Sequence, residues 1–339
     1  MRVTINDIAK KAKVSASTVS RVIADSPRIS AATKEKVLKI MKEMNYHPNM
    51  IARSLVNRST RIIGVVLPGL AEQSFQHPFF PELLAGIGSS ANQKGYKILL
   101  ANVDTVDEEQ QMVKELTYGG ITEGIILLTS RDQSPTVEQL VKIGFPFVVI
   151  GRTDNPCVNW VDNDNFLIGY QLAEHFIQQG HRRIAFLGYS PGYMVTRDRM
   201  HGYKKALEDH QLPFDQEMVV ESQFISGQGY DLMKLLLARK PRPTAVIACD
   251  DLLAFGAIKA IQEAGLQVPD DIGVAGINNV PLADYYNPPL TSVKINAFSL
   301  GTKAFEMLCT VLNSNVQSYN RAIIPAELVV RSSSRREKG

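Results

Sequence analysis

The chain has 339 residues, 45% of them hydrophobic, a length and composition that suit two or three globular domains. Its net charge of +3 is unevenly distributed: residues 1–60 carry 12 Lys and Arg against 4 Asp and Glu, whereas the remainder carries −5. A basic segment on an acidic body is typical of a polyanion-binding domain joined to a separate globular body. No apolar run has the length of a signal peptide or transmembrane helix, so we expect a cytoplasmic protein without membrane contact.

Residues 3–21, VTINDIAKKAKVSASTVSR, have the pattern of a helix-turn-helix. Thr4 can cap a first helix with Asp7 at the capping-box position, and Ser15 can cap a second helix after a short break. Apolar residues at helical spacing give both helices a buried stripe. The side chains expected to face away from the stripe of the second helix are Ala16, Ser17, Ser20 and Arg21.

The N-terminal end of such a second helix reaches base edges in a major groove, where Arg21 can read a guanine or bind a phosphate. A helical hairpin without DNA contacts is the alternative for so short a pattern. Ser30 can cap a third helix, Ala31–Met44, which would complete a headpiece over residues 1–48. Residues 49–60 are predicted to form a hinge helix and linker, and two helical turns are marginal in water without a partner.

From residue 61 onward, continuous apolar runs alternate with amphipathic helical patterns. The runs occupy residues 62–68, 97–101, 124–128, 147–150, 183–187, 245–248 and 273–277. The helical patterns occupy residues 80–94, 108–119, 169–179, 199–210, 229–237 and 252–265. This alternation predicts an α/β body of two open parallel sheets with helices on both faces, and a ligand pocket beyond the carboxyl ends of the strands.

Several enzyme classes are excluded by missing motifs. The turn after the first strand lacks GxGxxG, and the chain has no Walker A, GxSxG or HExxH motif. An acid/base or metal cluster is one interpretation of Asp162, Asp164, Asp250 and Asp251, but solvated or ligand-binding carboxylates fit better. The three cysteines, Cys157, Cys249 and Cys309, have no metal-site spacing and are expected to be buried reduced thiols. We predict no catalytic site, metal or cofactor.

The chain resembles the lactose-repressor/galactose-repressor family of bacterial transcription regulators over nearly its whole length. The motifs that carry the resemblance are DIAKKAKVSASTVSRVI, MNYHPNMIARSL, RIIGVVLP, GHRRIAFLG, AVIACDDLLAFGAIKAI, VPDDIGVAGINN and PPLTSVKIN. The family has a helix-turn-helix headpiece, a hinge helix and a periplasmic-binding-protein-like body. On this resemblance we assign residues 61–161 plus 292–320 to an N-terminal effector-binding subdomain, 162–291 plus 321–332 to a C-terminal one, and 333–339 to a polar tail.

The resemblance also implies DNA-binding residues. Ala16 and Ser17 match the pair that selects operator bases, Arg21 matches a base-contacting arginine, and Leu55 matches a hinge leucine that wedges between central base steps. The remaining positions implied to bind DNA are Thr4, Ser15, Thr18, Ser20, Asn49, Ala52 and Arg53. Reading a palindromic double-stranded operator requires paired headpieces, so a homodimer is expected, and the tail lacks the heptads of a coiled-coil tetramer.

An effector site between the subdomains follows from the same resemblance. Arg199 matches an arginine that binds effector hydroxyls or carboxylate. Asp250 and Asn278 match polar positions that grip the ligand, although many relatives carry Asn and Asp there. The other residues expected in the pocket are Phe79, Phe80, Leu83, Arg152, Tyr189, Tyr193 and Phe224. A core position is the alternative for each aromatic residue.

Aromatic faces with carboxylate, amide and guanidinium partners suit a sugar. Within the family, the chain is most similar to the maltose and maltodextrin regulators of Gram-positive bacteria. We therefore expect a repressor of a sugar-utilisation operon whose operator affinity is controlled by a maltose-type sugar in the cleft. A sugar phosphate, a nucleobase or a protein corepressor is the alternative signal, and a sugar-binding protein or an enzyme on doubly wound sheets is a more distant one.

Overall fold

The computed structural model describes residues 3–47, 59–69, 75–128, 131–189, 192–222, 228–314 and 318–335. The chain divides into two compact units, Met1–Arg61 and Ile62–Gly339, which we call the headpiece and the body. The predicted hinge residues Asn49, Ala52, Arg53 and Leu55 lie outside the described residues, as does the predicted pocket residue Phe224.

The headpiece contains helices α1 (Ile5–Ala12), α2 (Ala16–Ile23) and α3 (Ala31–Glu43). Each begins at the predicted cap, because Thr4, Ser15 and Ser30 accept a backbone N–H from the first turn through their hydroxyl oxygens. The helices enclose a small apolar core, which consists of Ile8, Ala9, Ala12, Val19, Val22, Val37, Ile40 and Met41. The predicted helix-turn-helix with a third closing helix is therefore present.

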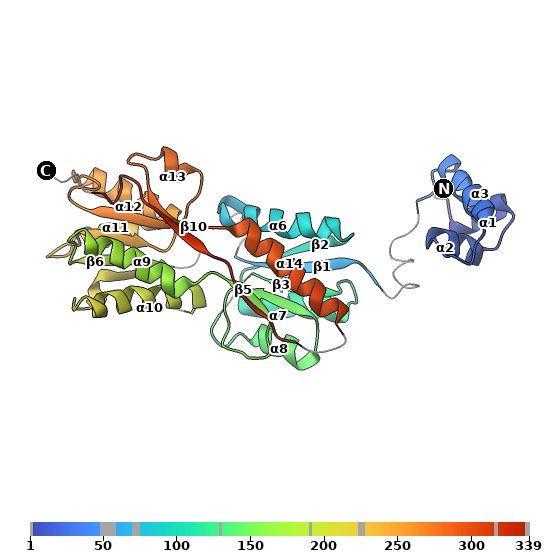
Figure 1. The fold of residues 1–339 in the computed structure, drawn as a ribbon, viewed down its shortest axis with the longest axis horizontal. Coiled ribbons are helices and arrows are strands. Elements are labelled where there is room, and N and C mark those ends of the chain that lie inside the picture. The colour runs from blue at the N-terminus through green and yellow to red at the C-terminus, as the bar shows by residue number, and fades with distance from the viewer. Residues whose placement is uncertain are drawn as a thin grey trace. The chain divides into compact units, whose positions relative to one another are not determined.

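The first sheet of the body is parallel throughout and has the strand order β11-β5-β4-β3-β1-β2 (Figure 1). Its strands are β1 (Ile62–Pro68), β2 (Lys97–Val103), β3 (Gly124–Leu127), β4 (Phe147–Ile150), β5 (Trp160–Asp162) and β11 (Arg321–Ile323). Helices α6 (Phe79–Gln93) and α14 (Ala297–Asn313) cover one face, and α7 (Val106–Tyr118) and α8 (Pro135–Ile143) cover the other. Alternate β1 side chains point to opposite faces: Val65 packs with α6, and Val66 packs with α7.

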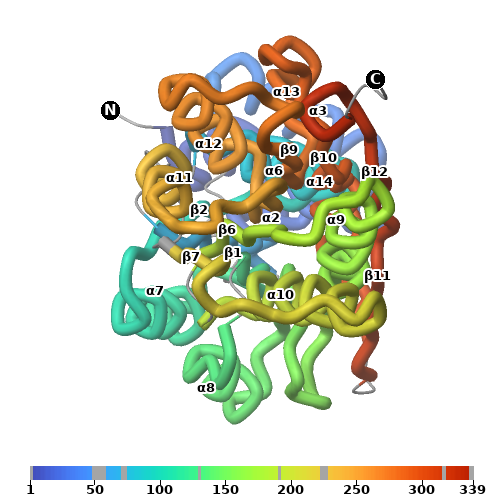
Figure 2. The backbone as a smooth tube through the Cα atoms, turned by 90° about the vertical axis from the view of Figure 1, so that its left-hand side faces the viewer, coloured from blue at the N-terminus to red at the C-terminus, as the bar shows by residue number. Residues whose placement is uncertain are grey.

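The second sheet has the order β12-β10-β9-β8-β6-β7, and only β12, at its edge, is antiparallel to its neighbour among the described strands. Its strands are β6 (Ile184–Tyr189), β7 (Val219–Ser222), β8 (Ala245–Ala248), β9 (Gly273–Asn278), β10 (Thr291–Ile295) and β12 (Ala326–Val329). The paired helices α9 (Asn165–Gln178) and α10 (Met194–Asp209) lie on one face, and α11 (Gly229–Leu237) and α12 (Asp251–Glu263) lie on the other (Figure 2). A 3-10 turn, Gln216–Met218, precedes β7, and the short helix α13 (Leu282–Tyr285) follows β9.

The chain crosses between the sheets in three places, after β5, after β10 and after β11. Two predicted boundaries are wrong as a result. Residues 292–295 belong to β10 in the second sheet, because they pair with β9, and residues 321–323 form β11 in the first sheet, beside β5. Figure 2 shows β11 and β12 following one another along one side of the body. The crossovers connect two subdomains, each built on one sheet.

Glycines allow two helix pairs to pack closely. A Cβ atom at Gly169 on α9 would overlap the carbonyl oxygen of Arg199 on α10, and one at Gly202 on α10 would overlap the carbonyl oxygen of Phe166 on α9. Gly86 and Gly301 make the equivalent contacts between α6 and α14. The helices of each pair therefore lie so close together that no side chain would fit at these glycine positions.

The predicted polar tail begins later than residue 333. Ser333 and Ser334 are fully buried, and the Ser333 hydroxyl donates to the Val274 carbonyl at 2.6 Å and accepts the Thr291 N–H at 2.8 Å. Ser333 therefore bonds to the inner strands β9 and β10 of the second sheet, and the Ser334 hydroxyl lies 2.7 Å from that of Thr291 on β10. None of the described helices has the length and apolarity needed to cross a membrane.

Candidate functional site

The exposed surface of α2 carries the side chains predicted to read DNA. Ser17 and Arg21 are exposed, whereas Ala16, Thr18 and Ser20 are half-buried. Ala16 packs in part against the headpiece core, which departs from the prediction that it faces away from the apolar stripe of this helix. The Ser15 hydroxyl lies 2.8 Å from that of Ser17 and 2.9 Å from that of Thr18, so these hydroxyls form one polar cluster at the start of α2.

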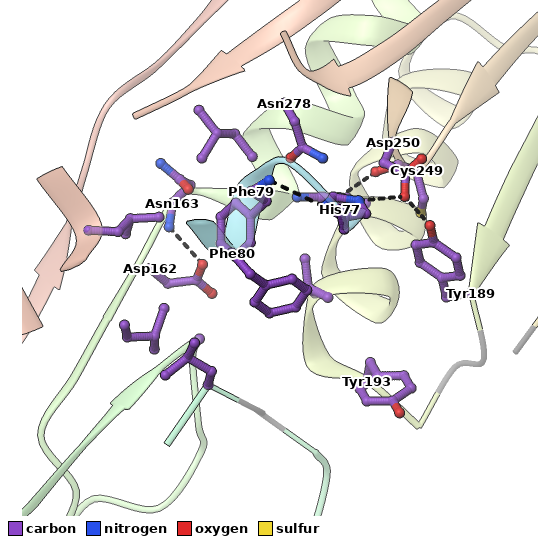
Figure 3. Close-up of a pocket in the computed structure, with 17 residues that line it drawn as sticks. His77, Phe79, Phe80, Asp162, Asn163, Tyr189, Tyr193, Cys249, Asp250 and Asn278 are labelled. Carbon is purple, nitrogen blue, oxygen red and sulfur yellow. Dashed lines mark hydrogen bonds and ion pairs between the residues drawn. The ribbon is translucent and has the colours of Figure 1, made fainter. Parts of the chain in front are cut away.

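The body contains a cavity of about 110 Å³ between its two subdomains (Figure 3). The cavity lies at the carboxyl ends of the strands of both sheets, as predicted from the α/β pattern. Its volume is several times the 10–15 Å³ or so that a single water requires, so it can admit part of an organic ligand. The lining residues are His77, Phe79, Phe80, Leu128, Ile150, Gly151, Asp162, Asn163, Tyr189, Tyr193, Val195, Arg199, Cys249, Asp250, Asn278, Ile295 and Leu300.

Most of the predicted pocket residues line this cavity, but two do not. Those that do are Phe79, Phe80, Tyr189, Tyr193, Arg199, Asp250 and Asn278. Leu83, in contrast, is fully buried in the core beneath α6, where the close packing of α14 leaves it no access to the cavity. Arg152 is held at the rim by ion pairs with Asp198 and Asp154.

Asp250 is the centre of a hydrogen-bonded cluster on the floor of the cavity. Its Oδ1 accepts the Leu253 N–H at 2.8 Å and so caps α12, while Oδ2 accepts the Tyr189 hydroxyl and lies 3.3 Å from Nε2 of His77. Burial opposes ionisation of Asp250, but the hydrogen bonds and attraction to the His77 ring outweigh it and hold the carboxyl pKa below its usual range. Burial and the Asp250 charge raise the pKa of Tyr189 well above 10, so the tyrosine remains a donor.

Arg199 lines the cavity from α10 and is 7% exposed. Its Nε donates to Oδ1 of Asn165 at 2.9 Å, and its Nη1 donates to the Cys249 carbonyl at 2.6 Å. Asn165 in turn donates to Asp162 at 3.0 Å. These bonds fix the guanidinium plane in the second subdomain and link it to the end of β5 in the first.

Asp162 lies at the first crossover and is almost fully buried. Its carboxylate accepts the backbone N–H groups of Arg152 and Asn163 at 2.8 and 2.7 Å. Burial raises its pKa to about 6, although these N–H groups and the positive charge of Arg199 lower it in part. Asp162 therefore changes charge near neutral pH at a point where the two subdomains meet.

Ion pairs join the subdomains at the rim of the cavity. Nε and Nη2 of Arg152 donate to the two carboxylate oxygens of Asp198 on α10 at 2.7 and 3.0 Å, a pairing that raises the arginine pKa further. Arg197 on α10 forms ion pairs with Asp132 and Asp154 of the first subdomain at 2.9 and 3.0 Å. Arg152 thus serves interdomain contact in this structure, which explains its absence from the pocket lining.

The four aspartates considered for a catalytic or metal site each have a structural role. Asp164 and Asp250 cap α9 and α12, Asp162 binds backbone N–H groups, and Asp251 is buried against Ser292 and the Val280 N–H. Within the described part of the chain, no group of three or more His, Cys, Asp or Glu is arranged to hold a metal ion. None of the three cysteines forms a disulfide within the described residues, and of the three only Cys249 is buried.

Sequence reasoning missed His77, Asn163 and Cys249 as lining residues. Asn163 and Cys249 follow β5 and β8 directly, so the rule that ligands bind at the carboxyl ends of strands identifies both. His77 has no comparable signal, because its partner Asp250 is 173 residues away in the chain.

Comparison with known proteins assigns the family. Residues 4–49 match the family described as bacterial regulatory proteins, lacI family, and residues 173–334 match a periplasmic binding protein-like domain. The HTH-type transcriptional regulator MalR of Streptococcus pneumoniae is 38% identical over 93% of this chain and 94% of its own. The chain belongs to the lacI family. It is therefore a DNA-binding transcription regulator, as predicted. The members of this family are regulators and not enzymes.

Solved structures of lacI-family regulators share the whole architecture. The lac repressor dimer bound to operator and the anti-inducer ONPF superposes with a TM-score of 0.88 and 28% identity, covering 98% of this chain and 99% of that one. The complex of the regulator CelR with cellobiose gives a TM-score of 0.77 and 29% identity, covering 98% and 100%. The predicted fold of a helix-turn-helix headpiece and a two-sheet α/β body is confirmed.

Proposed function

We propose that this lacI-family regulator is a homodimeric repressor of sugar-utilisation genes, and that an uncharged disaccharide or short maltodextrin in the cavity controls its operator affinity. The observation that carries the proposal is the composition of the cavity wall. Phe79, Phe80 and Tyr193 offer flat apolar faces for the C–H faces of sugar rings, while Asp250 and Asn278 offer groups that bind hydroxyls. The solved complex of the related CelR contains the disaccharide cellobiose, and the sequence motifs resemble maltose and maltodextrin regulators.

The charges of the lining favour a neutral ligand over a sugar phosphate. Asp162 and Asp250 are acidic, and the charge of Arg199 is already shared with Asn165, the Cys249 carbonyl and nearby Asp162. A phosphate group would meet the ionised Asp250, and the Nε and Nη1 donors of Arg199, a cation in the lining, are already engaged within the protein. Hydroxyls, which both donate and accept, suit this wall better.

The DNA-reading surface in this proposal is the start and exposed face of α2. Ser17 and Arg21 would contact base edges or phosphates, with the Ser15 and Thr18 hydroxyls beside them, and a dimer would place two such helices on a palindrome. Operators selected by the protein from a random DNA pool should be palindromic. Their affinity should fall steeply between 50 and 200 mM salt, because several phosphates release counterions. A selected sequence without symmetry would contradict the paired-headpiece arrangement.

The effector is tested by isothermal titration of the full-length protein with maltose, maltotriose, cellobiose, glucose, glucose 6-phosphate and adenine. We expect saturable binding of maltose or maltotriose and weaker binding of glucose 6-phosphate than of glucose. Binding of adenine alone would favour a nucleobase regulator. Absence of binding across the panel would favour a protein corepressor and reject the sugar assignment.

A further inference from the structure

His77 is a lining residue to which the proposed function gives no role. It lies between β1 and α6 in the first subdomain, is 7% exposed, and its side chain lies between Phe80 and Asp250 in the cavity (Figure 3). Its ring packs edge-on against Phe80, with the ring centroids 5.8 Å apart. The imidazole is therefore held in one place and directed at the second subdomain.

The two ring nitrogens have different partners, and this fixes the direction of the hydrogen bond to Asp250. Nδ1 lies 3.4 Å from the backbone nitrogen of Phe79 and accepts its N–H. Since Nδ1 is the acceptor, the proton of the neutral ring is on Nε2, which faces Oδ2 of Asp250 at 3.3 Å. A doubly protonated ring also presents an N–H at Nε2, so Asp250 meets a donor from the first subdomain in both states.

The hydrogen bond between His77 and Asp250 is longer than usual, so a ligand hydroxyl placed between them could form better hydrogen bonds with both. N–H···O bonds in proteins are about 2.9–3.0 Å long, and O–H···O bonds are about 2.7–2.8 Å. A hydroxyl group can donate to Oδ2 of Asp250 and accept from Nε2 of His77 at the same time. One bond of 3.3 Å would then be replaced by two bonds of ordinary length.

We propose that His77 is a specificity-determining residue and that His77 and Asp250 form a hydroxyl-bridging pair, in which one ligand hydroxyl is recognised from both subdomains. This inference rests on the proposed sugar-binding function of the cavity. The pair selects ligands that carry a hydroxyl at this position and rejects anionic groups there, because Asp250 only accepts hydrogen bonds. An inserted hydroxyl also moves Nε2 and Oδ2 apart, so occupancy changes the distance between the subdomains at this point.

Two substitutions of His77 distinguish the effect of its N–H donor from the effect of its side-chain volume. His77→Gln keeps an N–H donor near the position of Nε2, whereas His77→Leu removes the donor from a side chain of similar size. In titrations of the full-length protein with maltose and maltotriose, His77→Leu should weaken binding about tenfold, and His77→Gln should remain within about threefold of the unsubstituted protein. His201→Leu and His201→Gln, at an exposed position on α10, are the matched controls and should leave both affinities unchanged.

A second measurement needs no ligand. The urea midpoints of His77→Leu, Asp250→Ser and the double variant form a cycle, and serine retains a cap for α12 but is too short to reach His77. We expect non-additive midpoint shifts. The proposed pair would be overturned by additive midpoint shifts. It would also be overturned if the unsubstituted protein binds maltose and His77→Leu binds it equally well. Non-additive shifts in a protein that binds neither sugar would support the interdomain bond and reject the proposed effector, so the two failures are distinguishable.

Discussion

Asp162 is one of two buried aspartates whose titration is expected to affect the stability of the body near neutral pH, the other being Asp251, where burial raises the pKa to about 7. The folded pKa of Asp162, about 6, lies above the ordinary value of 3.8, so the folded chain holds the proton more tightly than the unfolded chain. Its contribution to the free energy of unfolding is complete below about pH 4 and is lost as the pH rises through 6. The size of this contribution is on the order of 3 kcal/mol.

Asp162→Asn should therefore flatten the dependence of stability on pH between about 4 and 6. Urea unfolding at several pH values measures this, and Asp164→Asn is the matched control because asparagine also caps helices well. Parallel pH profiles for the Asp162→Asn and unsubstituted proteins would show that this carboxyl does not titrate in the folded state as described.

Single residues were predictable from the sequence where a local rule applied. Thr4, Ser15 and Ser30 are caps because hydroxyl residues before apolar helical patterns satisfy the first N–H groups. The partners of Arg152 and His77 could not be predicted, because Asp198 and Asp250 are brought to them only by the crossovers between the sheets.

At the scale of elements, close helix packing in the second subdomain depends on Gly169 and Gly202. Gly202→Ala would push its methyl group into the α9 backbone, where the nearest atoms belong to Phe166 and Tyr170 and cannot move aside cheaply. We expect a loss of about 1–3 kcal/mol in the free energy of unfolding. Gly88→Ala, on α6 with no neighbour closer than 3.8 Å, is the matched control and should stabilise by up to about 1 kcal/mol. Thermal unfolding measures the stability of both variants, and equal changes in stability would contradict the close packing of α9 and α10 as the cause.

Seven strands and six helices of the body were predictable from the pattern of their apolar residues, whereas β7, β10, β12, α8 and α14 were not among the predicted elements. The three-residue strands β5 and β11 were missed as strands, since so few residues carry no period and their pairing depends on sequence-distant partners. The starts of α9 and α10 were predicted four to five residues too late.

At the scale of the whole body, the rim ion pairs hold the two subdomains together. The Arg197 guanidinium bridges Asp132 and Asp154, and partly exposed pairs of this kind contribute about 0.2–1 kcal/mol each. Arg197→Gln should therefore increase the radius of gyration of the full-length protein in small-angle scattering by shifting the population toward open bodies. Lys205→Gln, which breaks ion pairs within α10 alone, is the control. Equal scattering from both variants would show that the rim does not restrain the hinge.

A sugar bound between the subdomains is proposed to control the affinity of the headpieces for DNA. The most direct test is the fluorescence anisotropy of a labelled operator, selected from a random pool, with the full-length protein and increasing maltose. We expect maltose to release the operator from the unsubstituted protein. We also expect that Arg199→Lys, which loses the planar hydrogen-bonding fork, binds the operator normally but needs at least tenfold more maltose for release. Identical maltose responses from the two proteins would contradict the assignment of the cavity as the effector site.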